Sequence, residues 1–269
     1  MNKRDLFNDI TNKVINTIKS GVLPWQKPWV NGLPQNMFSK HIYNGINFLL
    51  LSFDNVAFPN YFTFLQAQQH NKKIKKNSKG RLIIFYKLHE IKTEDEIITF
   101  PYLKYSYVFN VEDLEDFEPP IPQLKKPIEI LNQIKSNHEI NFVQNSSQGC
   151  FYNVTKDFIS TPNVSYFVNE EKYFSSLFHE LIHWTGKEGR LNRFKKNDDD
   201  YHLYAHEELV AELGSSFLCG LCGINSVEET SSYIDFWLNK AKLDISFVPK
   251  CAILAQKAIN FLLNNSFTN

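Results

Sequence analysis

The sequence has no hydrophobic run long enough to cross a membrane. Its longest apolar stretches, such as INFLLLSF at 46–53, are far shorter than the roughly 20 residues that a membrane-spanning helix needs. The first ten residues, MNKRDLFNDI, carry acids where a secretory signal requires an apolar core, so we expect no export signal. Four cysteines in 269 residues do not indicate a disulfide framework. These absences predict a soluble, cytoplasmic protein that does not contact a membrane.

The sequence also lacks internal repeats and low-complexity tracts, and 43% hydrophobic residues are typical of a globular chain. Its formal net charge of zero hides an uneven distribution of charge. Residues 1–111 contain 15 Lys and Arg against 7 Asp and Glu, a net charge of +8. Residues 112–269 contain 14 against 22, a net charge of −8. A basic half and an acidic half on one chain indicate two domains with different partners.

Hydrophobic periodicity predicts an α+β fold. Helical spacing predicts a helix at 3–20, and NYFTFLQAQQHN at 60–71 is expected to form a short helix. The segment YNGINFLLLSF at 43–53 is interpreted as a turn followed by an apolar strand or helix. A basic turn at 72–81 leads into a strand, and the alternating pattern of PYLKYSYVFNVEDL at 101–114 predicts another.

The acidic, proline-rich segment EDFEPPIPQLKKP at 115–127 is the best candidate for a linker. We therefore expect a small basic α+β domain at 1–118, a linker at 119–127, and a mainly helical domain with a small sheet at 128–269. In this last domain, strands are expected within INFVQN and CFYNVTKDFIS, followed by helices at 171–185, about 203–219, about 232–243 and about 249–264.

The segment HELIHWTG at 179–186 carries the strongest chemical signal. Residues four apart on a helix share one face, with Cβ atoms about 6 Å apart, so His179 and His183 can direct imidazole nitrogens at one point. Glu180 lies about a third of a turn away, where it can reach a water bound at that point but is badly placed to be a ligand. Zinc held by neutral nitrogen and oxygen ligands acidifies its water, and a nearby carboxylate can take the proton.

A second predicted helix, YAHEELVAELGSSF at 204–217, supplies acidic residues for the same site. Glu208 can provide a third ligand. Glu212, one turn later on the same face, can accept a hydrogen bond from the far nitrogen of a metal-bound histidine. A fourth position then stays open, as a catalytic site requires. A buried helix with this motif and no metal would leave several polar groups unsatisfied, which favours the metal site.

Cations and aromatic residues are interleaved in the N-terminal half, where KKIKKNSKGR at 72–81 places six positive charges in ten residues. Such a pattern suits single-stranded DNA, because lysines can follow phosphates and rings can stack on bases. The candidate contact residues are Trp25, Lys27, Trp29, Lys40, Tyr43, Lys72, Lys73, Lys75, Lys76, Lys79 and Arg81. A solvated basic turn with two core tryptophans explains the composition equally well, so composition leaves both interpretations open.

The two halves together resemble the ArdC-type antirestriction proteins of plasmids and phages. The resemblance rests on LFNDITNKVINTIKSGVLPWQKPW, GLPQN, YNGIN and TFLQAQ in the first half, and on DFISTP, LFHELIHWTG, RLNR, EELVAELGSSFL and YIDFWL in the second. It implies a single-stranded DNA-binding domain followed by a zincin-type metallopeptidase domain, with a small twisted sheet over an active-site helix. It also implies His179, His183 and Glu208 as ligands of Zn²⁺ or another divalent transition metal, and Glu180 as the general base. The basic turn carries less glycine than is usual in the family, which leaves its charge in place.

The function implied by the resemblance is protection of incoming plasmid or phage DNA from host restriction. In one hypothesis a zinc-dependent peptidase, tethered to single-stranded DNA, cuts an unidentified protein found there. The alternative is a non-enzymatic protein that coats single-stranded DNA and uses the metal only to stabilise its fold. Glu180 favours the enzyme, because a purely structural site has no use for a base beside its open position.

Overall fold

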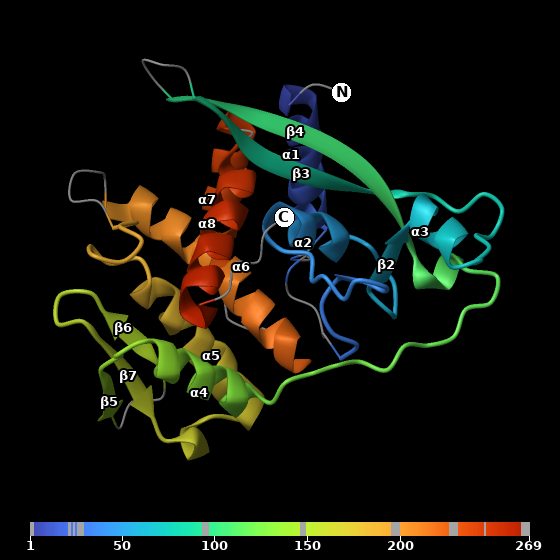
Figure 1. The fold of residues 1–269 in the computed structure, drawn as a ribbon. Helices are drawn as coiled ribbons and strands as arrows, with labels where there is room; N and C mark the ends of the chain where they lie inside the picture. The colour runs from blue at the N-terminus through green and yellow to red at the C-terminus, as the bar shows by residue number, and fades with distance from the viewer. Residues whose placement is uncertain are drawn as a thin grey trace.

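The computed structural model has an α+β architecture, with two small sheets packed against a group of helices (Figure 1). The long hairpin of the first sheet crosses one end of the molecule, and the second sheet lies at the other end (Figure 1). The structure describes residues 3–20, 23, 25, 30–92, 97–145, 149–194, 200–225, 231–244 and 246–264.

In the first half, the part of the chain that the structure describes forms a four-stranded sheet with three helices. Its elements are α1 (Lys3–Lys19), β1 (Gln35–Asn36), α2 (Gly45–Ser52), β2 (Asn60–Thr63), α3 (Phe64–Gln69), β3 (Arg81–Lys92), β4 (Ile97–Asn110) and a 3₁₀ turn (Val111–Asp113). The strand order is β1-β2-β4-β3, and β3 and β4 form an antiparallel hairpin with Ile84 opposite Tyr105. The expected helix at 3–20 and the expected strands are confirmed, and the apolar segment after Gly45 is a helix.

The expectation of one short helix over 60–71 is wrong in its first part. Asn60–Thr63 is strand β2, which pairs with β4 so that Tyr61 lies opposite Asn110. Thr63 then caps α3: its hydroxyl accepts a hydrogen bond from the N–H of Gln66, whose side chain bonds back to the N–H of Thr63. This capping box starts the helix four residues later than the sequence pattern implies.

The described residues of the second half form a three-stranded sheet and five helices. Its elements are α4 (Pro127–Asn137), β5 (Phe142–Asn145), β6 (Phe151–Asn153), β7 (Phe158–Pro162), a 3₁₀ turn (Val164–Tyr166), α5 (Glu170–Trp184), α6 (Asp200–Cys222), α7 (Ser231–Leu243) and α8 (Phe247–Leu263). The sheet order is β5-β7-β6, which leaves β6 at an edge. The four expected late helices are confirmed. In the described part of the chain no single helix is long and apolar enough to cross a membrane, although α7 and α8, bent by 114°, pass that test as a pair.

One hydrophobic core joins the two halves. Trp25 is fully buried, and its ring meets that of Trp237 edge to face, with centroids 6.2 Å apart. Phe48 of α2 meets Phe217 of α6 in the same way at 5.5 Å. The hydroxyl of Ser216 donates a hydrogen bond to the carbonyl of Trp25. Helices of the first half therefore pack directly on helices of the second, with α1 against α7 and α2 against α8.

The proline-rich segment at 117–126 forms no helix or strand and leads from the first sheet to α4 (Figure 1). The N–H of Lys125 donates a hydrogen bond to the carbonyl of Leu221 at 2.9 Å. Leu124 packs against Gly223, which has a φ of +67° and where a Cβ would lie only 2.5 Å from Leu124 Cδ1. Only glycine allows both this positive φ and this close approach of Leu124. The hydrogen bond and the packing contact hold the segment against the end of α6.

Candidate metal centre

Helix α5 forms because its start is capped and one of its faces is apolar. Asn169 accepts a hydrogen bond from the N–H of Lys172 at 2.8 Å, which satisfies one free donor of the first turn. The apolar residues that flank the two histidines are all buried: Phe174, Leu177, Phe178, Leu181 and Ile182. After the helix the chain turns back at Gly186, where a Cβ would lie 2.8 Å from the ring of Phe194. This close return brings residues 190–194 beside the site.

Helix α6 crosses α5 at a small residue. A Cβ on Gly214 would lie 2.7 Å from Cδ1 of Ile182, so a larger residue would push the helices apart. Glu208 lies about 1.7 turns earlier on α6. The close crossing therefore allows its short side chain to reach both histidines of α5.

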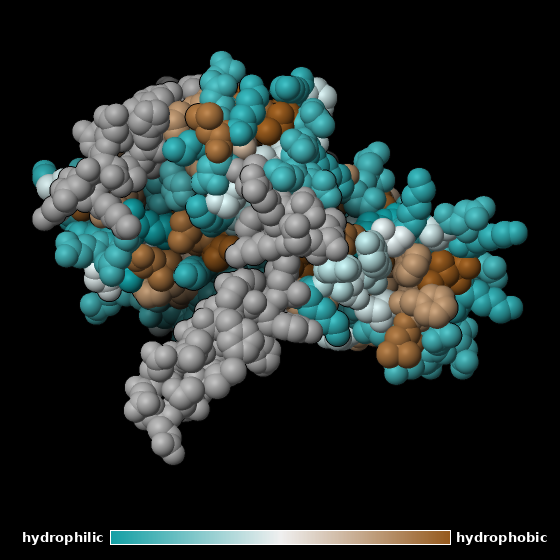
Figure 2. All heavy atoms as spheres, turned by 90° about the horizontal axis from the view of Figure 1, so that it is seen from above, coloured by the Kyte–Doolittle hydropathy of each residue, from teal (hydrophilic) through white to brown (hydrophobic). Residues whose placement is uncertain are grey.

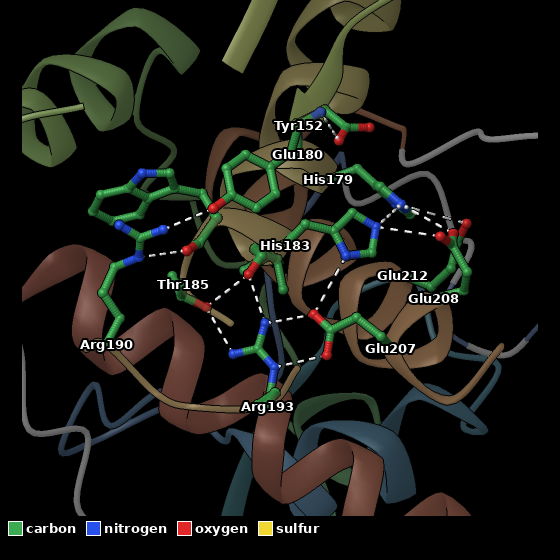
Figure 3. Close-up of polar contacts among 12 residues, drawn as sticks. Tyr152, His179, Glu180, His183, Thr185, Arg190, Arg193, Glu207, Glu208 and Glu212 are labelled. Atoms are coloured by element: carbon green, nitrogen blue, oxygen red, sulfur yellow. Dashed lines mark hydrogen bonds and ion pairs between the residues drawn. The ribbon is translucent and has the colours of Figure 1, made fainter. Parts of the chain in front are cut away.

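Three side chains converge on one point, as the sequence predicts (Figure 3). The two Nε2 atoms of His179 and His183 lie 3.0 Å apart. Oε2 of Glu208 lies 3.3 Å from Nε2 of His179, and its Oε1 lies 3.4 Å from Nε2 of His183. A tetrahedral ion with bonds of about 2.1 Å sets its ligand atoms roughly 3.4 Å apart. These buried residues thus fit a divalent metal in both donor type and spacing.

The far nitrogen of each histidine faces a second carboxylate. Nδ1 of His179 lies 4.0 Å from Oε1 of Glu212, which is the neighbour that the sequence predicts. Nδ1 of His183 lies 3.3 Å from Oε1 of Glu207, which the sequence reasoning missed. Glu207 directly precedes Glu208, so its side chain lies about 100° farther round the helix. The pair of adjacent glutamates was the only available signal for this second contact.

Arg193 supports this arrangement from the segment after α5 (Figure 3). Its Nε and Nη2 donate to the two carboxylate oxygens of Glu207 at 2.8 and 2.6 Å. It also donates to the hydroxyl of Thr185 at 2.8 Å and to the carbonyl of Ile182 at 2.7 Å. The sequence assigns no role to this arginine, although it is the last residue of the motif RLNR.

The charges of the site favour a cation at its centre. Burial lowers the pKa of His183, but hydrogen bonds with Glu207 and Glu208 outweigh burial and hold that pKa well above its ordinary value. Burial raises the pKa of Glu208, but hydrogen bonds from His179 and His183 outweigh it and leave this pKa far below the ordinary range. Arg193 likewise keeps the pKa of Glu207 low against the effect of burial. Ionised carboxylates that surround a histidine and raise its pKa are the pattern expected where a site stabilises positive charge.

Glu180 lies beside the ligands without joining them. Its Oε2 accepts a hydrogen bond from the backbone N–H of Tyr152 in strand β6 at 2.7 Å. It lines a cavity of about 520 Å³ together with the three ligand side chains, Phe151 and Tyr204. A carboxylate in this position can exchange a proton with a molecule that enters the cavity, as the sequence predicts for a general base.

A second arginine holds strand β6 in place. Arg190 donates to both oxygens of Asp157 at 3.0 and 2.6 Å and to the hydroxyl of Tyr152 at 2.8 Å. Its guanidinium stacks on Trp184 at 4.0 Å from the ring centroid. The hydroxyl of Tyr152 in turn donates to Asp157 at 2.7 Å. This cluster ties the β6–β7 turn to the end of α5, and the motif RLNR was its one signal in the sequence.

The structure corrects part of the predicted DNA-contact set. Trp25 and Tyr43 are buried, at 0% and 5% exposure, so neither ring face is available to a base. Lys27 and Trp29 lie outside the described residues. The exposed members of the predicted set are Lys40, Lys73, Lys75, Lys76 and Lys79.

An acidic segment runs alongside the basic turn. Lys72 forms an ion pair with Asp116 at 2.7 Å, and the N–H of Glu115 donates to the carbonyl of Lys73 at 3.0 Å. Arg81 forms ion pairs with Asp54 and Asp113. Lys72 and Arg81 are therefore already neutralised within the protein, which the charge count along the sequence could not reveal.

Aromatic residues that the sequence analysis did not select are exposed beside this turn. Tyr105 and Tyr107 are 42% and 53% exposed, and their spacing of two places them on one face of β4. Thr63 pairs with Val108, so Phe64, which is 57% exposed, lies at the level of Tyr107. Apolar side chains are gathered on the surface at the end of the molecule that carries α3 (Figure 2). The alternation in KYSYVF was an available signal for this face.

Comparisons with known proteins agree with the geometry. The chain matches the N-terminal domain of anti-restriction factor ArdC over residues 4–109 and the zincin-like metallopeptidase family over residues 129–253. It is 27% identical to a DNA primase TraC of Escherichia coli and 24% identical to the uncharacterised protein y4eC of Sinorhizobium fredii. These alignments cover 97% and 96% of this chain. The chain spans only 27% of the length of that primase, but 91% of y4eC.

Two solved structures correspond to the chain in both fold and length. The metal-free crystal structure of the antirestriction ArdC protein from the R388 plasmid superposes with a TM-score of 0.80 at 29% identity, covering 96% of both chains. The Mn(II)-bound structure of that protein gives a TM-score of 0.78 at the same identity. The chain belongs to the ArdC-type antirestriction family, in which an ArdC N-terminal domain precedes a zincin-like metallopeptidase domain.

Proposed function

We propose that this protein is a metal-dependent peptidase that acts on proteins at single-stranded DNA and thereby protects incoming plasmid or phage DNA from restriction. One observation carries the proposal. The three converging ligands, His179, His183 and Glu208, line the same cavity as the carboxylate of Glu180. A site built only for stability would need no carboxylate beside its open side.

The residues of the site divide the work of hydrolysis. His179, His183 and Glu208 would hold the ion, with Zn²⁺ proposed and another divalent transition metal as the alternative. When bound, such an ion supplies a Lewis acid that polarises a carbonyl and lowers the pKa of water. Glu180 takes a proton from the attacking water at its carboxylate and can pass it to the leaving amine. The N–H of Tyr152 holds Oε2 of Glu180, and the Glu180 side chain lines the cavity.

The exposed aromatic face supports the DNA part of the proposal. Tyr105 and Tyr107 of β4 and Phe64 at the start of α3 offer exposed ring surfaces in the ArdC-type domain. Lys76 and Lys79 lie on the neighbouring turn and are exposed. Rings that stack on bases beside lysines that contact phosphates are the usual means of holding single strands with little sequence preference. Duplex DNA offers no free base faces, so we expect single strands to be preferred.

The test of the peptidase is hydrolysis of an unfolded protein. Casein, incubated with the full chain and Zn(II) or Mn(II), should be cleaved, with products identified by mass spectrometry. Glu180→Gln should retain the metal but lower the rate by about 10² to 10⁴, the usual contribution of a general base. Glu171→Gln, on the exposed first turn of the same helix, is the matched control and should cleave normally. Normal cleavage by the Glu180→Gln protein would refute the assignment.

The second candidate function is a protein that coats single-stranded DNA without enzymatic activity. The exposed aromatic face favours this candidate, because binding to that face could shield single-stranded DNA from nucleases without any peptidase activity. The two candidates separate in a conjugation assay with the Glu180→Gln protein. Loss of protection would support the peptidase, whereas full protection with unchanged DNA affinity would support coating alone.

A further inference from the structure

The side chain of Arg193 makes several hydrogen bonds beside the candidate metal centre. Its side chain is only 5% exposed. It donates four hydrogen bonds, two of them to the oxygens of Glu207 and two to acceptors at the end of α5, the hydroxyl of Thr185 and the carbonyl of Ile182. One guanidinium therefore joins α5, α6 and the returning segment at a single point.

The contact with Glu207 fixes the position of that carboxylate. A two-bond arginine–carboxylate pair has a planar, directional geometry, so Glu207 loses its freedom to rotate. Oε1 of Glu207 faces Nδ1 of His183 at 3.3 Å. A hydrogen bond at Nδ1 sets the orientation of the ring and directs the lone pair of Nε2 towards Glu208 and His179.

We propose that Arg193 is a positioning residue for the metal: it acts through Glu207 to orient His183, and so raises the affinity of the site. This inference rests on the metal centre of the proposed function. It adds a three-residue relay, Arg193–Glu207–His183, that runs from outside the ligand set to one ligand. The ligand His179 has a different neighbour, Glu212, and does not depend on this relay.

Arg190 provides a matched comparison within the same segment. It too is largely buried, with a side-chain exposure of 14%, and it too binds both oxygens of a carboxylate, that of Asp157. Its partners are Asp157, Tyr152 and Trp184, none of which is a metal ligand. Removing Arg190 should thus disturb the fold as much as removing Arg193, but should not disturb the histidines.

The test measures the affinity of the full chain for Mn(II) alone. Binding is monitored through the electron paramagnetic resonance signal of the free ion. Arg193→Met and Glu207→Met should each weaken binding by about 10- to 100-fold, the usual effect of losing a partner of a metal ligand. The double variant R193M/E207M should bind no more than about threefold more weakly than Glu207→Met, because two residues in one relay are not additive. Arg193→Lys keeps the charge but not the two-bond geometry, so it should give an intermediate affinity. Arg190→Met should bind within about twofold of the unchanged protein, because it lies outside this relay.

Each outcome decides the inference. The double variant replaces the whole buried pair with apolar side chains of similar volume, which usually permits folding even where single variants fail. If it binds Mn(II) as the unchanged protein does, the relay is refuted. Equal losses in the Arg190 and Arg193 variants, or losses that add in the double variant, would also refute it in favour of a structural role. If the unchanged protein binds no Mn(II), both this inference and the proposed metal centre fail, whereas normal binding with an inert Arg193 overturns the relay alone.

Discussion

Nδ1 of His179 lies 4.0 Å from Oε1 of Glu212, one helical turn beyond the proposed ligand Glu208. Oε2 of Glu208 lies 3.3 Å from Nε2 of the same ring. One imidazole is thus placed between two glutamates of α6, with the proposed ligand Glu208 on its inner side and Glu212 on its outer side. Loss of the inner carboxylate removes a bond to the ion, whereas loss of the outer one only frees the ring.

The first prediction follows from this difference. Glu208→Gln should weaken Mn(II) or Zn(II) binding more than Glu212→Gln, because an amide is a poorer ligand than a carboxylate and the outer contact acts only through the histidine. Isothermal titration of each ion into the two variants measures the order. The reverse order would mean that Glu212 is the ligand and Glu208 its support.

Replacing one of the proposed histidine ligands should abolish metal binding and the stabilisation that the metal provides. We expect His183→Ala to contain almost no metal after purification without chelator, since two ligands alone hold an ion weakly. An ion at 100 times its dissociation constant stabilises the binding state by about 2.7 kcal/mol. Added Mn(II) should therefore raise the melting temperature of the unchanged protein but not of His183→Ala. One tightly bound ion per chain in the variant would contradict the ligand assignment.

The contacts of Asp157 with Arg190 and Tyr152 predict that the stability of the fold depends on pH. Hydrogen bonds from Arg190 hold the pKa of Asp157 well below its ordinary value, and burial opposes them only in part. The stabilisation from a lowered pKa is fully present above the unfolded-state pKa, about 3.9, and is lost as pH falls towards the folded-state pKa. The difference in unfolding free energy between the unchanged protein and Asp157→Asn should be constant from about pH 7 to 5 and shrink below about pH 4. Urea unfolding at each pH measures it, and a difference that stays constant down to pH 3 would disprove this origin.

The DNA-binding prediction now distinguishes lysines that look alike in the sequence. Lys72 is paired with Asp116, whereas Lys76 is exposed and forms no ion pair within the described residues. Lys76→Gln should lower the salt dependence of single-stranded DNA affinity by roughly 0.7 log units per decade of salt, and Lys72→Gln by less. Tyr107→Ala should cost about 1 to 3 kcal/mol of binding without changing that slope. Fluorescence anisotropy of a labelled oligonucleotide at several salt concentrations measures both quantities, and equal slopes for the two lysine variants would contradict the pairing argument.

The local sequence pattern was sufficient to predict features that depend on a single helix. Helices α1 and α5 have regular apolar spacing, and the His-Glu-x-x-His motif fixes the relative placement of His179, Glu180 and His183 through helix geometry alone. Glu208 could be predicted because a third ligand was required and an acidic helix followed. These predictions depend on neighbours in the sequence, which is why they could be made.

The failures all depend on partners that are distant in the sequence. Asn60–Thr63 is a strand because it pairs with β4, about 45 residues later, and no local pattern records that pairing. Trp25 resembles a stacking residue in the sequence, but Trp237 and the carbonyl-bound Ser216 place it in the core. Glu207 and Arg193 meet only because α5 ends at a tight turn and the chain returns. The fold class and the convergence of His179, His183 and Glu208 were thus predictable, whereas the contacts that support them were not.

The shared core also limits how the protein can move. Because Trp25, α1 and α2 are packed among the C-terminal helices, residues 1–118 expressed alone would expose a large apolar surface, and we expect that fragment to be aggregated or unfolded by circular dichroism. A monomeric, cooperatively melting fragment would contradict this. Because one core joins the described parts of the two halves, the cavity beside Glu180 keeps a constant offset and orientation relative to the exposed aromatic face. Single-stranded DNA bound to that face would therefore set a fixed spacing. Only proteins bound at one particular distance along the DNA would come within reach of Glu180.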